Sequence, residues 1–184
     1  MEPQFKLIAL VGMPGAGKSV AGNFFRAKGI PILRFGDQTD ISLKEFHLER
    51  NETNEKFIRE KLRKDFGMAA YAIKMEPRIR EAEKSSKIIV LDGLRSWEEY
   101  VVLKEKFSQL VLLCIYAQPK LRYQRLSVRP VRPIPSHESR GRDISELVGL
   151  NMGGPIAIAD YLIQNDGDES HLREQLEDFY KQLL

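Results

Sequence analysis

The sequence predicts an α/β protein, a three-layer sandwich in which helices cover both faces of a five-stranded parallel sheet. Short apolar segments alternate with helical segments along the chain, as in proteins built from strand–helix–strand units with right-handed crossovers. The central apolar segments are apolar throughout, which is typical of parallel strands covered on both faces. Sheets of this kind bind ligands at the carboxyl ends of their strands, so a functional site is expected at that edge.

The expected strands lie at residues 6–11, 31–35, 87–92, 109–116 and 161–165. The first helix follows the first strand and ends near Gly29, where a helix stop is expected. Residues 40–86 form a long, charged segment of helical pattern, which predicts a two-helix insertion that binds an acceptor molecule. Within this insertion, one helical face is expected to carry Phe57, Ile58, Lys61, Leu62 and Phe66.

Residues 129–142 contain three prolines and one glycine, which predicts a loop or flexible flap without regular helix. The last helix is expected at residues 169–184, with its apolar side chains in the core. The chain then forms a single domain over residues 1–184. Its core segments are 1–39, 87–128 and 143–184, its helical insertion is 40–86, and its lid is 129–142.

The composition is that of a globular protein, with 42% hydrophobic and 30% charged residues. No apolar run approaches the length of a membrane span, and the first residues lack a signal-peptide pattern. Cys114 is the only cysteine, which excludes a disulfide within the chain and favours a cytoplasmic location. The net charge of +3 is too small to indicate nucleic-acid binding, and the three histidines lack metal-ligand spacing.

The strongest motif is the pattern G-x-x-x-x-G-K-S, which runs from Gly12 to Ser19 between the first strand and the first helix. Glycines permit unusual backbone angles and close approach, so successive N–H groups converge on an anion at the positive end of a helix. Lys18 supplies a positive charge for the β- and γ-phosphates, and the Ser19 hydroxyl can bind Mg²⁺. The residues predicted to bind the triphosphate are Gly12, Met13, Pro14, Gly15, Ala16, Gly17, Lys18 and Ser19.

Three charged residues follow other strands of the expected sheet, and their side chains should meet at the same edge. Asp92 ends an apolar strand, where its carboxylate can hold Mg²⁺ directly or through water, opposite Ser19. Arg95 follows Asp92 and can grip the phosphate of a second substrate, although a surface ion pair is nearly as good an interpretation. Asp37 follows the second strand. It serves as a general base if the acceptor is a hydroxyl, and as a positioning group if the acceptor is a phosphate.

A basic segment follows the fourth strand. Residues 120–142 contain seven cationic side chains and a single carboxylate, that of Glu138. A proline-broken basic flap suits a lid that closes over phosphates, neutralises developing charge and excludes water. A solvated basic surface, or a patch that binds RNA, is the alternative. The cations are Lys120, Arg122, Arg125, Arg129, Arg132, Arg140 and Arg142.

These motifs resemble the nucleoside-monophosphate-kinase-like branch of P-loop proteins. The resemblance is carried by the phosphate loop, by GD after the second strand, DGLR after the third, RLSVR at 125–129 and ADYLIQNDG at 159–167. Nearly the whole chain is more closely similar to an archaeal family of small P-loop proteins related to dephospho-CoA kinase and adenylate kinase. The matching segments are VGMPGAGKS, KLRKDFG, LDGLRS, RGRD and ADYLIQNDG.

The resemblance also implies roles for residues outside the phosphate loop. Arg125 matches an arginine that stacks on the donor base, and Arg129 is the second arginine of that element. Residues 165–167, with Asn165 and Gly167, match the loop that flanks the adenine. Arg95 matches the arginine of a DGFPR motif, and Arg63 is an acceptor-side cation by resemblance to the archaeal family alone. The flap departs from the family pattern because it lacks the paired aspartates common among relatives.

We therefore expect a phosphotransferase that uses Mg²⁺ and ATP and acts on a small, nucleotide-like acceptor as a monomer or homodimer. Lys18, Arg129, Arg140 and Mg²⁺ would gather the negative charge of the moving phosphoryl group. The acceptor is either a nucleoside monophosphate or a hydroxyl compound such as dephospho-CoA. The alternative is an ATP-hydrolysing regulatory or partner-binding protein, because a phosphate loop alone does not specify transfer. Membrane and nucleic-acid partners are not expected.

Overall fold

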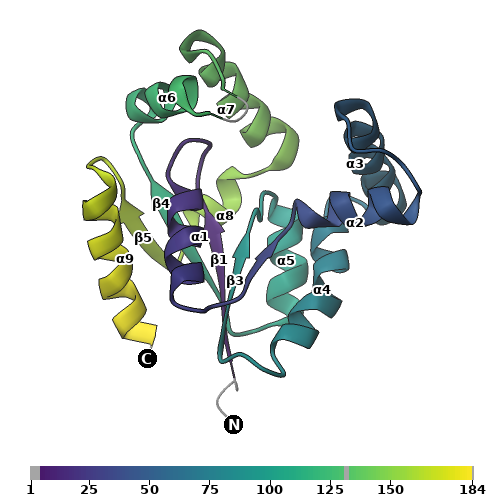
Figure 1. The fold of residues 1–184 in the computed structure, drawn as a ribbon, viewed down its shortest axis with the longest axis horizontal. Coiled ribbons are helices and arrows are strands. Elements are labelled where there is room, and N and C mark those ends of the chain that lie inside the picture. Colours follow the sequence, from purple (N-terminus) through teal and green to yellow (C-terminus); the bar gives the residue numbers. More distant parts are fainter. Residues whose placement is uncertain (1–4, 131–132, 184) are drawn as a thin grey trace.

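The computed structural model describes residues 5–130 and 133–183, and its elements alternate between strands and helices (Figure 1). The strands are β1 (Lys6–Val11), β2 (Ile32–Arg34), β3 (Ile88–Asp92), β4 (Leu110–Tyr116) and β5 (Tyr161–Gln164). The helices are α1 (Lys18–Ala27), α2 (Asp37–Glu45), α3 (Glu52–Phe66), α4 (Ala70–Ala82), α5 (Trp97–Lys106), α6 (Pro119–Val128), α7 (Ser136–Leu150), α8 (Gly153–Ala157) and α9 (Glu169–Leu183). Each expected strand is present, within one or two residues of its expected bounds.

The five strands form one parallel sheet in the order β2-β3-β1-β4-β5. The central strand β1 pairs with β3 on one side, where Leu10 lies opposite Asp92, and with β4 on the other, where Leu10 lies opposite Leu113. The register places Asp92 beside the end of β1, where the glycine-rich loop begins. The α/β sandwich with a five-stranded parallel sheet is thus confirmed.

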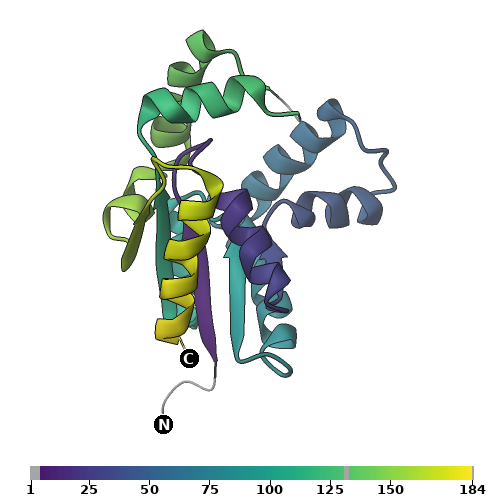
Figure 2. The ribbon, with the colours of Figure 1, turned by 60° about the vertical axis from the view of Figure 1, so that its left-hand side comes forward.

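Alternate residues of β1 point to opposite faces of the sheet, and each face is covered by helices. Leu7 and Ala9 belong to one core cluster, which also contains Met75 and Ile79 of α4 and Leu103 of α5. The second cluster lies on the opposite face and joins β1 to α1 and α9 through Ile8, Leu10, Phe25, Leu172 and Leu176. Figure 2 shows α1 and α9 running beside each other over this face. The two interfaces between the sheet and its helical layers are therefore packed with apolar side chains, as the apolar strands predict.

The lid differs from expectation, because residues 136–142 are the first half of a regular helix, α7. The three prolines precede this helix, and Pro135 occupies the N-cap position, where a missing N–H is not a loss. Gly141 lies inside α7 at a cost of about 1 kcal/mol relative to alanine. Packing of the buried Ser139 and Asp143 against the rest of the protein overrides that propensity. Residues 131 and 132, with Arg132 of the basic segment, lie outside the described residues.

The insertion between β2 and β3 holds three helices, where two were expected. Among them, α4 packs its buried residues Tyr71, Met75 and Ile79 against the sheet, while α2 and α3 project beyond the edge of the sheet (Figure 1). The single apolar face predicted for α3 is only partly right. Ile58 and Leu62 are buried, whereas Phe57 and Phe66 are 49% and 43% exposed.

Two further expectations concern single features of the chain. Cys114 is fully buried in β4, and burial raises the pKa of its thiol, as for a core residue. Within the described part of the chain, we find no helix that is both long and apolar enough to cross a bilayer.

Candidate functional site

The loop between β1 and α1 has the backbone geometry of an anion cradle. Gly12, Gly15 and Gly17 have φ angles of 137°, 79° and 111°, a region that residues with side chains rarely adopt. A Cβ atom at Gly12 would lie 2.2 Å from the backbone oxygen of Ile115, and one at Gly17 would lie 2.3 Å from Asn165 Nδ2. Only glycine fits at these positions. The loop then leads its N–H groups into the first turn of α1, whose positive end favours an anion.

Lys18 opens α1 and folds back over this loop. Its ammonium group donates to the backbone oxygen of Gly12 at 2.5 Å and to that of Met13 at 3.2 Å. Burial above all, and the nearby Arg95 to a smaller extent, lower its pKa to about 8, although Asp92 and Glu146 act in the opposite direction. An incoming phosphate would offer this ammonium a stronger acceptor than the two carbonyls.

Two oxygen donors suitable for Mg²⁺ come from the elements next to the cradle, α1 and β3. Ser19 is exposed in the first turn of α1, and Asp92 ends β3 with a side chain 25% exposed. Hydroxyl and carboxylate oxygens are the hard ligands that Mg²⁺ prefers, and the ion usually takes its remaining ligands from water and substrate phosphates. Among residues 5–130 and 133–183, no three His, Cys, Asp or Glu residues form a metal cage. The donor set therefore fits a nucleotide-bound Mg²⁺.

The phosphate loop is tied to α6 and α7 by a buried ion pair. Arg122 donates from both terminal nitrogens to Asp143, over 2.8 and 2.6 Å, and also donates to the backbone oxygen of Pro14 at 3.0 Å. The hydroxyl of Tyr123 donates to the same carboxylate at 3.0 Å. Arg122 was grouped with the lid cations, but its guanidinium is committed to these partners and buried. These contacts tie the loop to α6 and α7, which the run of basic residues in the sequence did not reveal.

The loop after β5 forms a second support for the cradle. The Asn165 side chain donates to the backbone oxygen of Ala16 at 2.7 Å, from a buried position. Arg125 of α6 donates to the backbone oxygens of Asn165 and Gly167 at 2.9 and 3.0 Å. Asn165, Gly167 and Arg125 are thus brought together beside the phosphate loop, where Arg125 joins α6 to this segment.

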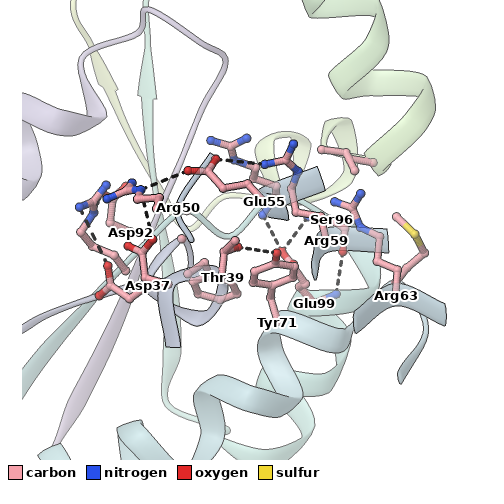
Figure 3. A pocket seen from close by; sticks show the side chains of 18 residues that line it. Asp37, Thr39, Arg50, Glu55, Arg59, Arg63, Tyr71, Asp92, Ser96 and Glu99 are labelled. Carbon is pink, nitrogen blue, oxygen red and sulfur yellow. Dashed lines mark hydrogen bonds and ion pairs between the residues drawn. The ribbon is translucent and has the colours of Figure 1, made fainter. Parts of the chain in front are cut away.

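A cavity of about 330 Å³ opens at the same edge of the sheet, between α2, α3, α4 and the segment after β3 (Figure 3). Five arginines and five carboxylates line it, together with Thr39 and Tyr71, whose hydroxyls are 2.8 Å apart. The charged lining residues are Arg34, Arg50, Arg59, Arg63, Arg95, Asp37, Asp40, Glu55, Asp92 and Glu99. Asp92 lines this cavity and lies opposite Leu10 near the end of β1, so the cavity adjoins the start of the phosphate loop.

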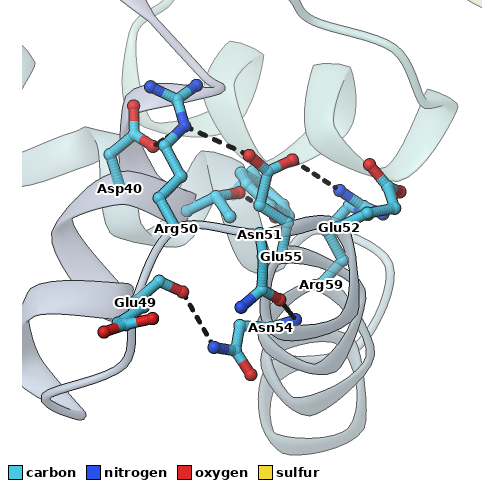
Figure 4. A network of polar contacts seen from close by, with 10 residues as sticks. Asp40, Glu49, Arg50, Asn51, Glu52, Asn54, Glu55 and Arg59 are labelled. Carbon is cyan, nitrogen blue, oxygen red and sulfur yellow. Dashed lines mark hydrogen bonds and ion pairs between the residues drawn. The ribbon is translucent and has the colours of Figure 1, made fainter.

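Some of these charges are paired within the cavity wall. Arg50 lies 3.2 Å from Glu55 and 3.5 Å from Asp40, and Arg59 lies 3.4 Å from Glu55 (Figure 4). This network fixes the start of α3 against α2. Its charges balance one another and so contribute shape to the cavity more than net potential.

Asp37, the expected general base, is also engaged. Its Oδ2 lies 3.2 Å from Arg78 Nη2, and its Oδ1 lies 4.0 Å from Arg34 Nη1. Arg78 comes from α4 and donates as well to the backbone oxygen of Arg34 at 3.3 Å. Asp37 therefore lies in the cavity, as expected, but its carboxylate joins α2 to α4.

Within the described chain, Arg63 and Arg95 are the cavity arginines that form no ion pair with a carboxylate of the lining. Among the described residues, no carboxylate oxygen lies within 4.0 Å of Arg63, and Arg95 reaches only Glu146, at 3.7 Å, which lies outside the lining. Both act on Glu99, whose Oε2 accepts from the backbone N–H groups of Arg95 and Ser96 at 2.8 and 3.2 Å. Burial raises the pKa of Glu99 to about 7 despite these contacts.

Of the other basic residues described in this segment, Lys120 lies in the first turn of α6, and Arg142 of α7 pairs with Glu146. Arg129 follows the last residue of α6, and Arg140 is exposed on α7. The sequence interpretation missed Glu99, Glu146 and the partnership of Arg122 with Asp143. Glu99 carries a readable signal, because Ser96 and Glu99 form a capping box at the start of α5. Nothing local marks Glu146, which α7 brings close to Lys18 and Arg95.

A glycine-rich phosphate loop at the carboxyl edge of this parallel sheet defines a nucleotide-binding P-loop protein of kinase-like fold. A family model described as an AAA domain matches residues 8–143. The UPF0200 protein of Pyrococcus horikoshii is 31% identical over 182 residues, 97% of each chain. The UPF0200 protein of Hyperthermus butylicus is 34% identical over 169 residues, which cover 90% of this chain and 89% of that protein. The chain belongs to this archaeal UPF0200 family, as its resemblance to small archaeal P-loop proteins predicted.

Solved structures agree on the fold. A shikimate kinase from Bacteroides thetaiotaomicron matches with a TM-score of 0.61 and 16% identity, over 97% of this chain and 98% of that chain. A shikimate kinase from Acinetobacter baumannii in complex with shikimate matches with a TM-score of 0.57 and 14% identity, over 97% and 94% of the two chains. At these identities the likeness concerns the fold alone.

Proposed function

We propose that this protein is a phosphotransferase that uses Mg²⁺ and ATP and transfers the γ-phosphoryl group to a small anionic acceptor held in the arginine-lined cavity. The single observation that carries the proposal is the placement of that cavity at the sheet edge that bears the phosphate loop, with its lining residue Asp92 opposite Leu10 near the end of β1. A protein that only binds or hydrolyses ATP has no need of a second charged cavity at the transfer point.

The residues divide the work by position. The N–H groups of residues 12–19 and the ammonium of Lys18 hold the triphosphate, while Ser19 and Asp92 hold Mg²⁺ and the water around it. The ion, when bound, neutralises charge on the phosphates. Arg95, with Arg63 across the cavity, holds the anionic group of the acceptor through charge-assisted hydrogen bonds. Bringing the two substrates into line accounts for most of the rate in reactions of this type.

The contacts of Asp37 favour an acceptor phosphate over an acceptor hydroxyl. A general base must reach the proton it removes, and the Asp37 carboxylate is shared between Arg78 and Arg34. A phosphate acceptor is already an anion and needs no base. We therefore place nucleoside monophosphates ahead of hydroxyl compounds such as dephospho-CoA.

The first test is ATP binding measured by isothermal titration calorimetry in the presence of Mg²⁺. The wild-type protein is expected to bind, and Lys18→Ala is expected to lose most of the heat. Lys181→Ala is the matched control, because Lys181 is 65% exposed near the end of α9 and, among the described residues, forms its ion pair with Asp178 alone. Binding that survives Lys18→Ala unchanged would reject the nucleotide site.

The second test measures ADP formation with a panel of nucleoside monophosphates and dephospho-CoA. A true acceptor raises turnover, and Arg95→Met and Arg63→Met each raise its KM at least tenfold. Turnover that proceeds to water at one rate, whatever acceptor is present, would favour the ATP-hydrolysing alternative. If Asp37→Asn abolishes transfer to a hydroxyl acceptor, the preference for phosphate acceptors is wrong.

A further inference from the structure

The acceptor cavity contains a pair of hydroxyl groups to which the proposed reaction gives no role so far. Thr39 of α2 and Tyr71 of α4 both line the cavity, and their hydroxyl oxygens lie 2.8 Å apart (Figure 3). Both residues are buried, with exposed fractions of 8% and 7%. The hydrogen bond between them joins two helices, and its two residues are 32 positions apart in the sequence.

One hydrogen of this pair has no partner in the protein. Each hydroxyl has one hydrogen to donate, and the bond between the two oxygens uses only one of the two hydrogens. Nowhere in the part of the chain that the structure describes does either oxygen make a second hydrogen bond. Burial raises the pKa of Tyr71 above its usual value, so the tyrosine keeps its proton at neutral pH. The pair therefore offers one O–H donor to a molecule in the cavity.

The surroundings of the pair differ from the charged edge of the cavity. Met68 and Leu150 line the same cavity with half-buried apolar side chains. Asp37 and Asp92 lie to the left of the pair in Figure 3, and Arg34 lies within 4.0 Å of each of them. The cavity thus combines a charged region at the strand ends with an apolar region that has one polar donor. Such a region suits a flat ring with a polar edge.

The transfer reaction fixes the orientation of the acceptor molecule. Its anionic group must meet the γ-phosphoryl group at the strand ends, so the rest of the molecule extends toward the hydroxyl pair and Met68. We propose that Thr39 and Tyr71 determine acceptor specificity by donating a hydrogen bond to a carbonyl oxygen or a ring nitrogen of a nucleobase. This inference rests on the proposed function, because the proposed transfer reaction sets this orientation.

The proposal predicts opposite results for stability and for binding. Replacing both partners of a buried hydrogen bond by apolar groups of the same shape is nearly neutral for stability. The double variant Thr39→Val with Tyr71→Phe is therefore expected to melt within about 2 °C of the wild type. The same change leaves an accepting atom of the base without a donor. We expect this loss to weaken nucleotide binding about tenfold to a hundredfold.

Isothermal titration calorimetry without ATP tests the binding half of this prediction. The probes are AMP, GMP, CMP and UMP, together with ribose 5-phosphate, which has the sugar and the phosphate but no base. The double variant is expected to lose affinity for the preferred nucleotide and to bind ribose 5-phosphate as the wild type does. A folded double variant that keeps the wild-type affinity for the nucleotide, or that loses both ligands to the same extent, would overturn the inference.

The matched control is Thr53→Val with Tyr180→Phe, which makes the same chemical change outside the cavity. Thr53 is exposed on α3 and Tyr180 is half-buried on α9, and neither residue lines the cavity. This control is expected to bind both ligands like the wild type. Should the Thr39 and Tyr71 double variant not fold, Thr39→Val and Tyr71→Phe are measured separately. At least one of them is then expected to show the selective loss, and wild-type affinity in both would count against the inference.

Binding and transfer can fail separately, which distinguishes this inference from the function beneath it. If a nucleotide binds but receives no phosphoryl group from ATP, the proposed function fails, while the hydroxyl pair keeps its role in binding. If the wild-type protein binds no nucleotide more tightly than ribose 5-phosphate, the role of the hydroxyl pair is rejected, whatever the result with ATP.

Discussion

Replacing Asp143 by asparagine is expected to damage this protein far more than its place on a lid helix suggests. Asp143 and Arg122 have side chains 10% and 5% exposed, and they meet through two short hydrogen bonds of 2.8 and 2.6 Å. Asparagine has nearly the same shape but carries no charge, and its amide group turns a donor toward a guanidinium that has no acceptor function. Arg122 would then be a buried charge without a counterion.

The size of the effect follows from that burial. Breaking a buried pair by removing one partner costs about 3 to 5 kcal/mol, because the remaining charge is uncompensated. For a domain of this size, that corresponds to a fall in the melting temperature of roughly 6 to 20 °C. The damage also reaches the phosphate loop, since Arg122 Nη1 donates to the Pro14 oxygen as well as to Asp143. ATP binding is therefore expected to weaken in Asp143→Asn even at temperatures where the variant is folded.

Thermal unfolding followed by circular dichroism measures the stability, and calorimetry measures ATP binding. Asp178→Asn is the control, because Asp178 and Lys181 are 72% and 65% exposed, and such a surface pair contributes less than about 1 kcal/mol. The double variant Arg122→Met with Asp143→Leu removes both charges and is expected to regain most of the stability without regaining ATP affinity. An Asp143→Asn protein that melts within about 2 °C of the wild type would refute the role assigned to this pair.

Three further predictions concern Gly12 in the phosphate loop, Lys18 beside it, and Glu99 in the wall of the cavity. Gly12→Ala is expected to cost at least about 1 to 3 kcal/mol and to abolish ATP binding, because φ is 137° and the new Cβ would meet the Ile115 oxygen at 2.2 Å. Gly29→Ala is the control, because Gly29 has a φ of 76° but no atom lies within 4 Å of its Cβ. It therefore suffers backbone strain without a steric clash. Equal behaviour of the two variants in thermal melts and calorimetry would contradict this prediction. MgATP affinity is expected to be constant below pH 8 and to fall by up to tenfold per unit above it, because the pKa of Lys18 lies at about 8 and only the ammonium attracts phosphate. Calorimetry between pH 6 and 10 checks this, and a flat profile would show that Lys18 keeps its proton throughout. Glu99 has its pKa raised from 4.5 to about 7, so its ionisation weakens the folded state increasingly as the pH rises from 4.5 to 7. Glu99→Gln keeps the acceptor for the backbone N–H groups. Its free energy of unfolding in urea is expected to rise by about 3 kcal/mol relative to that of the wild type between pH 4.5 and pH 8. A difference in unfolding free energy that does not change with pH would contradict this prediction.

The elements that could be predicted from the sequence are those that neighbouring residues specify. Each strand is a local apolar run, and the phosphate loop is a contiguous motif whose glycines must tolerate positive φ, so neighbouring residues alone specify them. The first half of α7 was not predictable, because prolines and Gly141 argue locally against helix. Burial of Ser139 and the ion pair between Asp143 and the distant Arg122 outweigh those propensities. The prediction of a single apolar face on α3 was only partly right for a related reason, since α2 and α4 cover Ile58 and Leu62 and leave Phe57 exposed.

By itself, then, the sequence determined that this protein is a parallel α/β sandwich with a phosphate cradle at one edge, and which charged residues follow its strands. Only the tertiary structure decided what those charges do. It buried Arg122 against Asp143, engaged Asp37 with Arg78, left Arg63 and Arg95 facing the cavity, and carried Glu146 into the neighbourhood of Lys18. The physical reason is the distance along the chain over which each property is determined. Apolar periodicity and backbone freedom are local properties, whereas the effect of a charge depends on the partners and the burial that chain segments far apart in sequence provide.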